Sequence, residues 1–290
     1  MKSGFVAVVG RPNVGKSTLV NAAVGTKVAI TSPRPQTTRN TIRGVVHGEE
    51  RQLVLVDSPG LHKPKNALGE RLNRLVYGTL AESDAALFVI DATSPIGPGD
   101  RLIAERLRES GIQTVVAVNK TDLGDKDAVI SQLGHAGEWD FAAYVPVSAL
   151  TGENVDLVVE ELASLMPEGP AYFPTEMVTD QPEQTVIGEL VREKYLARLR
   201  EELPHSLTVS VEDIEERPNG TTYISARVIV ERDSQKGIVI GKGGEMLKTV
   251  GQEARTEIEA LLGTSVFLEL RVKVEKGWQD KPQLLDRLGF

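Results

Sequence analysis

Residues 10–17 read Gly10-Arg-Pro-Asn-Val-Gly-Lys-Ser17, and this stretch decides the fold of the first part of the chain. It follows an apolar run, Phe5–Gly10, that is typical of a buried strand, and it precedes the helical segment Ser17–Ala23. A strand, a glycine-rich turn and a helix in this order point backbone N–H groups and the positive end of a helix dipole at an anion. The stretch therefore predicts a phosphate-binding loop.

Around this loop, short apolar runs alternate with amphipathic stretches. Such alternation predicts an α/β domain, a mostly parallel sheet flanked by helices. Strands are expected at Phe5–Gly10, Gln52–Val56, Ala85–Ile90, Thr114–Val118 and Tyr144–Val147, and helices at Gly99–Glu109 and Val155–Met166.

The length of 290 residues favours two domains. The segment Pro167–Pro182 carries four prolines and is expected to be extended. We place an α/β domain at residues 1–170, a linker at 171–182 and a smaller α+β domain at 183–290.

The smaller domain begins with a long helix, expected at Gln184–Leu203 and ending before Pro204. Two alternating runs, separated by the turn sequence Arg217-Pro-Asn-Gly220, predict paired strands. A short apolar helix, a glycine-rich turn, a further helix to about Leu262 and a last strand follow. The three strands are expected at Leu207–Glu216, Thr221–Glu231 and Val266–Val274.

Composition excludes several classes of protein. There is no cysteine, so disulfides, thiolate catalysis and cysteine-bound zinc are ruled out. No apolar run approaches the roughly 18 residues of a membrane span, and the N-terminus lacks the layout of a signal peptide. The net charge is −8 and neither half is a polycation, so nucleic-acid binding must rest on a local patch or on base recognition. The four histidines, His47, His62, His135 and His205, show no spacing typical of metal ligands.

The sequence Asn119-Lys-Thr-Asp122 selects the nucleotide. It follows the strand Thr114–Val118 and so lies at a carboxyl end, where open α/β sheets bind ligands. The Asp122 carboxylate can accept two hydrogen bonds from N1–H and the 2-amino group of guanine, a donor pair that adenine lacks. Ser148-Ala149-Leu150 follows the next strand and supplies backbone N–H groups for the guanine oxygen. These motifs predict a GTP site.

Several side chains are candidates for catalysis and for Mg²⁺. Lys16 is expected to reach the β- and γ-phosphates, and the Ser17 hydroxyl to bind Mg²⁺. Asp57 ends the strand Gln52–Val56 and can hold Mg²⁺ through a water. The mobile loop Thr31–Asn40 should supply one threonine to Mg²⁺, Thr38 in preference to Thr37, while the Gly60 N–H bonds the γ-phosphate.

Together these segments resemble translation-factor-type GTPases and, within them, the Era family: GRPNVGKS, QTTRN, DSPG, NKTD and SAL. The resemblance continues in REKYLARLREELPHS at Arg192–Ser206, GIVIGKGG at Gly237–Gly244 and FLELRVKVEKGW at Phe267–Trp278. It implies that the smaller domain is a type-II KH domain whose Gly241-Lys-Gly-Gly244 turn binds RNA. By this resemblance the ligand is the 3′ region of small-subunit (16S) ribosomal RNA, and the role is 30S subunit assembly, coupled to cell growth.

The resemblance also raises a catalytic question. Ras-type GTPases carry a water-orienting glutamine where this chain has Leu61, so slow intrinsic hydrolysis is expected. In related GTPases with asparagine at the position of Asn13, a bound K⁺ can act as an arginine finger does, and we carry this to Asn13 as a hypothesis.

The candidate sites are as follows. Catalysis is assigned to Lys16, Asn13, Thr38 and Gly60. GTP binding is assigned to Gly10, Arg11, Pro12, Asn13, Val14, Gly15, Lys16, Ser17, Thr18, Asp57, Ser58, Pro59, Gly60, Leu61, Asn119, Lys120, Thr121, Asp122, Ser148, Ala149 and Leu150. Mg²⁺ is assigned to Ser17, Thr38 and Asp57, K⁺ to Asn13, and RNA to Ile240, Gly241, Lys242, Gly243 and Gly244.

Two other functions remain open at this point: an RNA-binding module with GTP as a structural ligand, and a GTPase of membrane or cell-division control. For the second, Lys273, Lys276 and Lys281 offer at most a weak basic surface. We expect a cytoplasmic monomer, with contact to the inner face of the membrane as the alternative.

Overall fold

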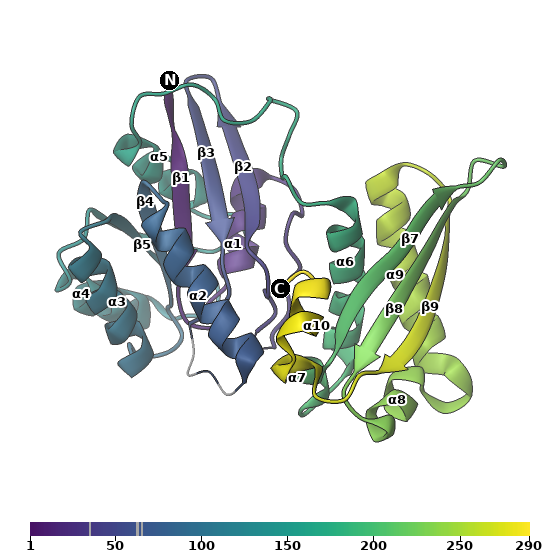
Figure 1. Cartoon of the computed structure of the whole chain (residues 1–290). Helices are drawn as coiled ribbons and strands as arrows, with labels where there is room; N and C mark the ends of the chain where they lie inside the picture. Colours follow the sequence, from purple (N-terminus) through teal and green to yellow (C-terminus); the bar gives the residue numbers. More distant parts are fainter. Residues whose placement is uncertain (35, 62–63, 65) are drawn as a thin grey trace. The chain divides into compact units, whose positions relative to one another are not determined.

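The computed structural model describes residues 1–34, 36–61, 64 and 66–290, and the chain forms two compact units (Figure 1). The first unit comprises Met1–Thr31, Thr38–Lys65 and Gly69–Asp180. The second comprises Ser32–Thr37, Asn66–Leu68 and Gln181–Phe290. Two short pieces from the first third of the chain therefore group with its last third.

A six-stranded sheet is the centre of the first unit. The strand order is β2-β3-β1-β4-β5-β6, and every neighbouring pair is parallel except β2 and β3. The strands are near-continuous runs of buried Val, Ile, Leu and Ala, because helices cover both faces. Their bounds are β1 Lys2–Val9, β2 Ile42–Gly48, β3 Arg51–Asp57, β4 Ala85–Asp91, β5 Gln113–Asn119 and β6 Ala143–Val147.

Two hydrophobic clusters, one on each face of the sheet, bury these strands. One contains Leu19 and Val20 of α1 with Val158 and Leu162 of α5, and the other contains residues of α2, α3 and α4. The expected mostly parallel sheet flanked by helices is therefore confirmed. The helices are α1 Lys16–Val24, α2 Ala67–Ala81, α3 Pro98–Ser110, α4 Lys126–Gly137 and α5 Val155–Leu165.

The register of the sheet brings the predicted motifs to one edge. Asp57 at the end of β3 pairs with Val8 of β1, and Asp91 at the end of β4 pairs with Asn119 of β5. Asn119 in turn pairs with Val147 at the end of β6. The loops after these strands therefore emerge side by side at the carboxyl edge, where an α/β sheet binds its ligand.

Strand β2, Ile42–Gly48, was not predicted from the sequence. It lies antiparallel at the edge of the sheet, and its exposure does not alternate cleanly. Gly44, one of its two glycines, packs against α1, because a Cβ there would lie within 2.9 Å of Val20 and Val24 side-chain atoms. A glycine at such a close approach weakens the strand signal in the sequence.

The proline-rich segment Pro167–Pro182, expected to be extended, contains bends at residues 172–173 and a turn at 175–176, and most of it is not a free linker. Up to Asp180 it belongs to the first unit. Ser3 N donates to the Pro167 carbonyl at 3.1 Å and Val45 N to the Val178 carbonyl at 2.9 Å. The Gln52 side chain, at the other strand of the edge, bonds the backbone of Phe173 in both directions.

A three-stranded sheet with helices forms the second unit. β7 Thr208–Glu216 pairs antiparallel with β8 Thr222–Val230, which confirms the expected pairing, and β8 pairs parallel with β9 Val266–Val274. Helix α9 buries Val250, Ala254 and Ile258 at a spacing of four residues. The helices are α6 Glu183–Arg198, α7 Leu203–Ser206, α8 Asp233–Ile240, α9 Glu245–Leu262 and α10 Pro282–Arg287, with single turns η1 Lys242–Gly244 and η2 Trp278–Asp280.

One expected helix was too long. The helix predicted to run to Leu203 ends at Arg198, where Leu199 turns to an extended conformation. Pro204 does not end it but lies at the second position of the short helix α7, where the N–H that proline lacks would have no helical partner. Within the described ranges, no helix is long and apolar enough to cross a membrane.

Candidate functional site

The loop between β1 and α1 holds Lys16 under the turn. Its ammonium donates to the Gly10 carbonyl at 3.1 Å and to the Arg11 carbonyl at 3.0 Å, and the side chain is almost fully buried. Burial lowers the pKa of Lys16 to about 8, against the opposing effect of the Asp57 carboxylate. A buried ammonium at the first position of helix α1 is a site for an anion, because the helix N-terminus also favours negative charge.

Beside Lys16, three oxygens from three segments converge. Ser17 Oγ donates to Asp57 Oδ2 at 2.5 Å, and it lies 2.9 Å from Thr38 Oγ1. Thr38 Oγ1 is 3.4 Å from the same Asp57 oxygen. Thr37 bonds elsewhere: its hydroxyl donates to the Arg34 carbonyl at 2.7 Å. The geometry therefore favours Thr38 over Thr37 as the partner of Ser17 and Asp57.

The Asp57 carboxylate is fully buried and its second oxygen, Oδ1, has no hydrogen-bond partner among the described residues. Burial raises the pKa of Asp57, although Lys16, Ser17 and Thr38 each act to lower it. An orphaned carboxylate oxygen in a cluster of hydroxyls is a place for a hard cation, which takes oxygen ligands.

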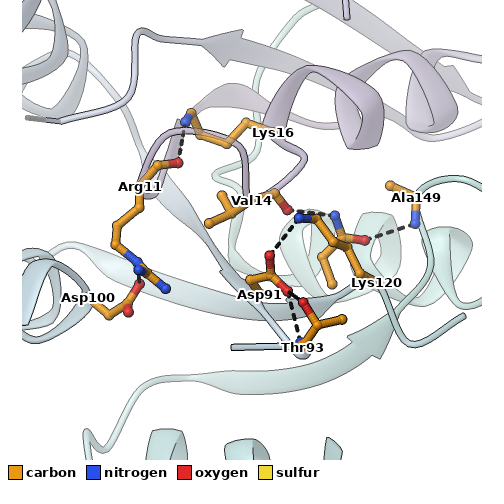
Figure 2. A network of polar contacts seen from close by, with 9 residues as sticks. Arg11, Val14, Lys16, Asp91, Thr93, Asp100, Lys120 and Ala149 are labelled. Carbon is orange, nitrogen blue, oxygen red and sulfur yellow. Dashed lines mark hydrogen bonds and ion pairs between the residues drawn. The ribbon is translucent and has the colours of Figure 1, made fainter. Parts of the chain in front are cut away.

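The segment that the sequence predicts to recognise guanine is built around Asn119. Its side-chain N–H donates to the Val14 carbonyl at 2.8 Å, and its side-chain oxygen accepts from the Ala149 N–H at 3.0 Å (Figure 2). One amide therefore joins the phosphate loop to the segment after β6. Asp122 is exposed, and its Oδ1 accepts from Ser148 Oγ at 2.6 Å.

Lys120 is fixed by a residue that sequence reasoning missed. Its ammonium lies 2.5 Å from Asp91 Oδ2, at the end of β4, and Asp91 Oδ1 accepts from the backbone and hydroxyl of Thr93 (Figure 2). Burial alone would raise the pKa of Asp91, but the bonds from Lys120 and Thr93 hold it below its usual value. The sequence did contain one indication of this role, because Asp91 ends the strand next to the one that carries Asn119.

The other residues that the sequence predicts for the nucleotide site are either exposed or packed against the framework of the first unit. Asn13 is exposed and has a positive φ of 65°, a conformation that asparagine tolerates better than most residues. Gly60 is buried against the phosphate loop, because a Cβ there would lie 2.7 Å from Pro12 N. Ser58 Oγ donates to the Val8 carbonyl at 2.8 Å and so bonds to the framework. Leu61 packs against the core, and Leu150 is exposed.

Arg11 turns away from the phosphate loop. Its Nε donates to Asp100 Oδ1 at 2.8 Å, in the first turn of α3 (Figure 2). Asp100, like Asp91, is a functional-site neighbour that sequence reasoning missed. The pair is 89 residues apart along the chain, so no local pattern could have predicted it.

The glycine-rich turn of the second unit joins α8 to α9. Gly241, Gly243 and Gly244 have φ angles of 78°, 63° and 82°, which favour glycine, and Lys242 and Gly243 are exposed. Gly244 is the N-cap of α9, so the first N–H groups of that helix open toward the turn. Ile240 lies half-buried at the end of α8.

Histidine and acidic clusters offer no other metal site in the portion of the chain described: no group of three or more His, Cys, Asp or Glu is arranged to hold a metal there. His62 lies outside the described residues.

Comparison with known proteins agrees with both units. Residues 5–120 match the family model described as a 50S ribosome-binding GTPase, and residues 202–279 match the KH domain model. GTPase Era of Mycolicibacterium paratuberculosis is 54% identical over 295 residues, covering 100% of this chain and 99% of that protein. GTPase Era of Mycobacterium tuberculosis is also 54% identical, covering 99% and 98%.

Solved structures show the same arrangement of elements. An Aquifex aeolicus Era variant bound to GDP.AlF4− has a TM-score of 0.96 and 38% identity, covering 100% of this chain and 99% of that one. A structure of Era in complex with MgGDPNP and nucleotides 1506–1542 of 16S ribosomal RNA has the same TM-score, identity and coverage.

The fold and the site define a P-loop GTPase joined to a KH domain. The chain belongs to the Era family of GTPases. The resemblance drawn from its motifs is therefore confirmed.

Proposed function

We propose that this protein binds GTP at the carboxyl edge of its six-stranded sheet, hydrolyses it with Mg²⁺, and binds the 3′ region of 16S ribosomal RNA during assembly of the 30S subunit. The observation that carries the proposal is the Asn119 amide, which bonds the phosphate loop at Val14 and the base segment at Ala149. It joins the proposed phosphate-binding and base-binding halves of the site within the first unit. We place this activity in the cytoplasm.

The oxygens of Ser17, Thr38 and Asp57 fit Mg²⁺. The fit rests on the buried Asp57 Oδ1 that has no hydrogen-bond partner in the described chain and on the two hydroxyls within reach of Oδ2. When bound, Mg²⁺ would neutralise charge on the β- and γ-phosphates. Lys16 would hold the same phosphates from below, and the Gly60 N–H would bond the γ-phosphate. Thr38 and Gly60 would then be held only while that phosphate is present.

The pKa of Lys16 makes nucleotide affinity depend on pH. In the free protein this pKa is about 8, and bound phosphates must raise it, since they favour the ammonium. Affinity is therefore full below pH 8 and falls as the pH rises, by at most about tenfold per pH unit. Titration with fluorescent GDP from about pH 7 to 9 measures this.

Lys16→Arg is the control for that titration, because a guanidinium does not lose its proton in this range. It should bind more weakly but with a flatter pH profile. A wild-type affinity that stays constant across the range would contradict the assignment of Lys16.

Catalysis needs a substitute for the missing glutamine. Leu61 is apolar and packs against the core, so it cannot orient water. We propose that K⁺, held by Asn13, supplies transition-state charge. The support is the position of Asn13 in the phosphate loop, exposed and in the left-handed region.

Hydrolysis is therefore expected to be about 100-fold faster in K⁺ than in Na⁺ at equal ionic strength, because losing one group that stabilises transition-state charge costs about 100- to 1,000-fold in rate. Single-turnover release of phosphate is the measurement. Asn13→Ala should lower the rate in K⁺ to the rate in Na⁺. Equal wild-type rates in the two salts, with Asn13→Ala without effect in both, would rule out the K⁺ role.

The RNA site is proposed at Ile240–Gly244. The support is a turn of three glycines with positive φ beside an exposed lysine and a helix N-terminus, which together let a phosphate backbone approach. Crosslinking of the protein to RNA in cells, followed by sequencing, should recover the 3′ end of 16S ribosomal RNA. Recovery of other RNA alone would contradict the target.

We further propose that the nucleotide state controls RNA binding. In the second unit, which includes Ser32–Thr37, the buried Arg192 donates to the Thr37 carbonyl and is held by Glu189 at 2.8 Å. The next residue, Thr38, is the one whose hydroxyl meets Ser17 and Asp57. Because the Thr37–Thr38 peptide is planar, orienting the Thr37 carbonyl also orients the Thr38 N–H.

RNA affinity is therefore expected to differ by about tenfold between the complex with a non-hydrolysable GTP analogue and that with GDP. Arg192→Gln should bring the two affinities together. Fluorescence anisotropy with 16S 3′-end RNA measures both, and thermal unfolding checks that the variant is folded. The exposed Arg255→Gln is the matched control. Equal wild-type affinities in both nucleotide states would remove the coupling.

A further inference from the structure

The side chain of Arg11 joins the phosphate-binding loop to helix α3. Figure 2 shows it running from the loop to Asp100, while its own backbone carbonyl faces Lys16. Arginine in such a loop could in principle reach a phosphate. Here its Nε is instead bonded at 2.8 Å to a carboxylate that is 1% exposed, so the guanidinium is held away from the phosphate position.

Each carboxylate oxygen of Asp100 accepts a hydrogen bond, and the two bonds have different roles. Its Oδ2 accepts from the Gly97 N–H at 2.9 Å and so caps the start of α3, where an acidic side chain also suits the helix dipole. Its Oδ1 accepts from Arg11. A buried carboxylate is costly unless it is paired and hydrogen-bonded, and Arg11 supplies both the charge and the second bond.

The alkyl part of Arg11 is fixed as well. A Cβ on Gly99 would lie 2.9 Å from Arg11 Cδ and 3.3 Å from Cγ, so the side chain lies flat on the first turn of α3. On the other side, the next residue of the loop, Pro12, is packed against Gly60. Residues 11 and 12 of the loop are therefore packed against α3 on one side and against the segment after β3 on the other.

The same stretch of loop backbone supplies the groups that bond to Lys16. Both acceptors of the Lys16 ammonium are loop carbonyls, Gly10 at 3.1 Å and Arg11 at 3.0 Å. If Arg11 were released, its carbonyl would rotate with the freed backbone and Lys16 would lose one of the two groups that hold it. We infer that Asp100 is a positioning residue for nucleotide binding, acting through Arg11 on Lys16. The inference rests on the proposed GTP site.

The test is a double-mutant cycle on nucleotide affinity. Arg11→Ala removes the clamp and leaves the cap on Gly97, while Asp100→Asn keeps an oxygen for the cap but loses the charge that attracts Arg11. Each is expected to weaken GDP and GTP-analogue binding by about tenfold, a typical effect of losing one charge-assisted hydrogen bond. The double variant should bind no more weakly than Arg11→Ala alone, because the two residues act as one.

Three results would overturn the inference. The first is full affinity in Arg11→Ala. The second is additive losses in the double variant, since these would mean that Asp100 acts only by capping α3. The third is an equal loss in Arg101→Ala, an exposed arginine in the same helical turn that serves as the matched control. Arg11→Lys should not restore affinity, because lysine lacks the Nε donor. Failure of the wild-type protein to bind GTP would instead count against the proposed function.

Discussion

Asp122→Asn is expected to lower the affinity for GTP by about 10,000-fold, the usual cost when a site built to hydrogen-bond a group loses its match. Asp122 Oδ1 is already bonded to Ser148 Oγ, which sets the orientation of the carboxylate. Guanine presents two donors, N1–H and the 2-amino group, and an asparagine can accept only one and must offer an N–H to the other. Xanthine carries an oxygen in place of the 2-amino group, so xanthosine triphosphate should bind the variant better than GTP does.

Competition between labelled GDP and unlabelled GTP or xanthosine triphosphate measures this change. Asp125→Asn is the matched control, because it makes the same chemical change three residues away. Asp125 caps α4 by accepting from the Ala128 N–H at 2.7 Å, and asparagine caps equally well. Ser148→Ala should weaken binding far less than Asp122→Asn. Retained GTP preference in Asp122→Asn would show that the base is read elsewhere.

Reversing charge at the glycine-rich turn is expected to remove most RNA affinity. The double variant Lys242→Asp, Gly243→Asp replaces one cation with two anions where the phosphate backbone must approach. A loss of about 100-fold is expected from one lost phosphate contact and two new repulsions. Anisotropy with single-stranded RNA from the 16S 3′ end measures it, and single-turnover GTP hydrolysis without RNA should stay at the wild-type rate.

The chain contains a close control for this variant. Lys276 and Gly277 form the same dipeptide, both are exposed, and Gly277 has a φ of 60° against 63° for Gly243. A Cβ meets nothing within 4 Å at either glycine, so aspartate fits equally well at both. Lys276→Asp with Gly277→Asp should therefore leave RNA affinity nearly unchanged. If both double variants lost affinity equally, the effect would come from net charge and not from the turn.

The parts of the fold that the sequence predicted were those specified by neighbouring residues. The phosphate loop lies between a strand and a helix within about 20 residues, and such local patterns are the most readable. The edge strand at Ile42–Gly48 was not predicted because it contains Gly44, and glycine is unfavourable in strands. The lack of a side chain at Gly44 lets α1 pack closely against the strand. The end of α6 at Arg198 is predicted too late from the sequence, because Pro204 indicates a later end to the helix.

In the candidate site, the residues proposed to contact nucleotide could be predicted from the sequence, and the residues that bond to their side chains could not. Asp122 and Lys16 belong to motifs with fixed spacing. Asp91 and Asp100 act on Lys120 and Arg11 across gaps of 29 and 89 residues, and only the folded sheet brings them together. The proline-rich segment after α5 shows the same limit, since its prolines do not indicate the bonds that it makes with Val45 and Gln52.

The Asn119 amide that bonds Val14 and Ala149 also restricts which sequences this family fold can accept. A Cβ on Gly15 would lie 2.2 Å from Asn119 Nδ2, and Gly15 has a φ of 98°. No side chain at position 15 is therefore compatible with Asn119 in place, and a smaller residue at 119 would release the two loops it joins. In a library of variants, substitutions at positions 15 and 119 that keep nucleotide binding should be rare, even when both positions change together. The two positions are therefore constrained jointly, although they lie far apart in the sequence.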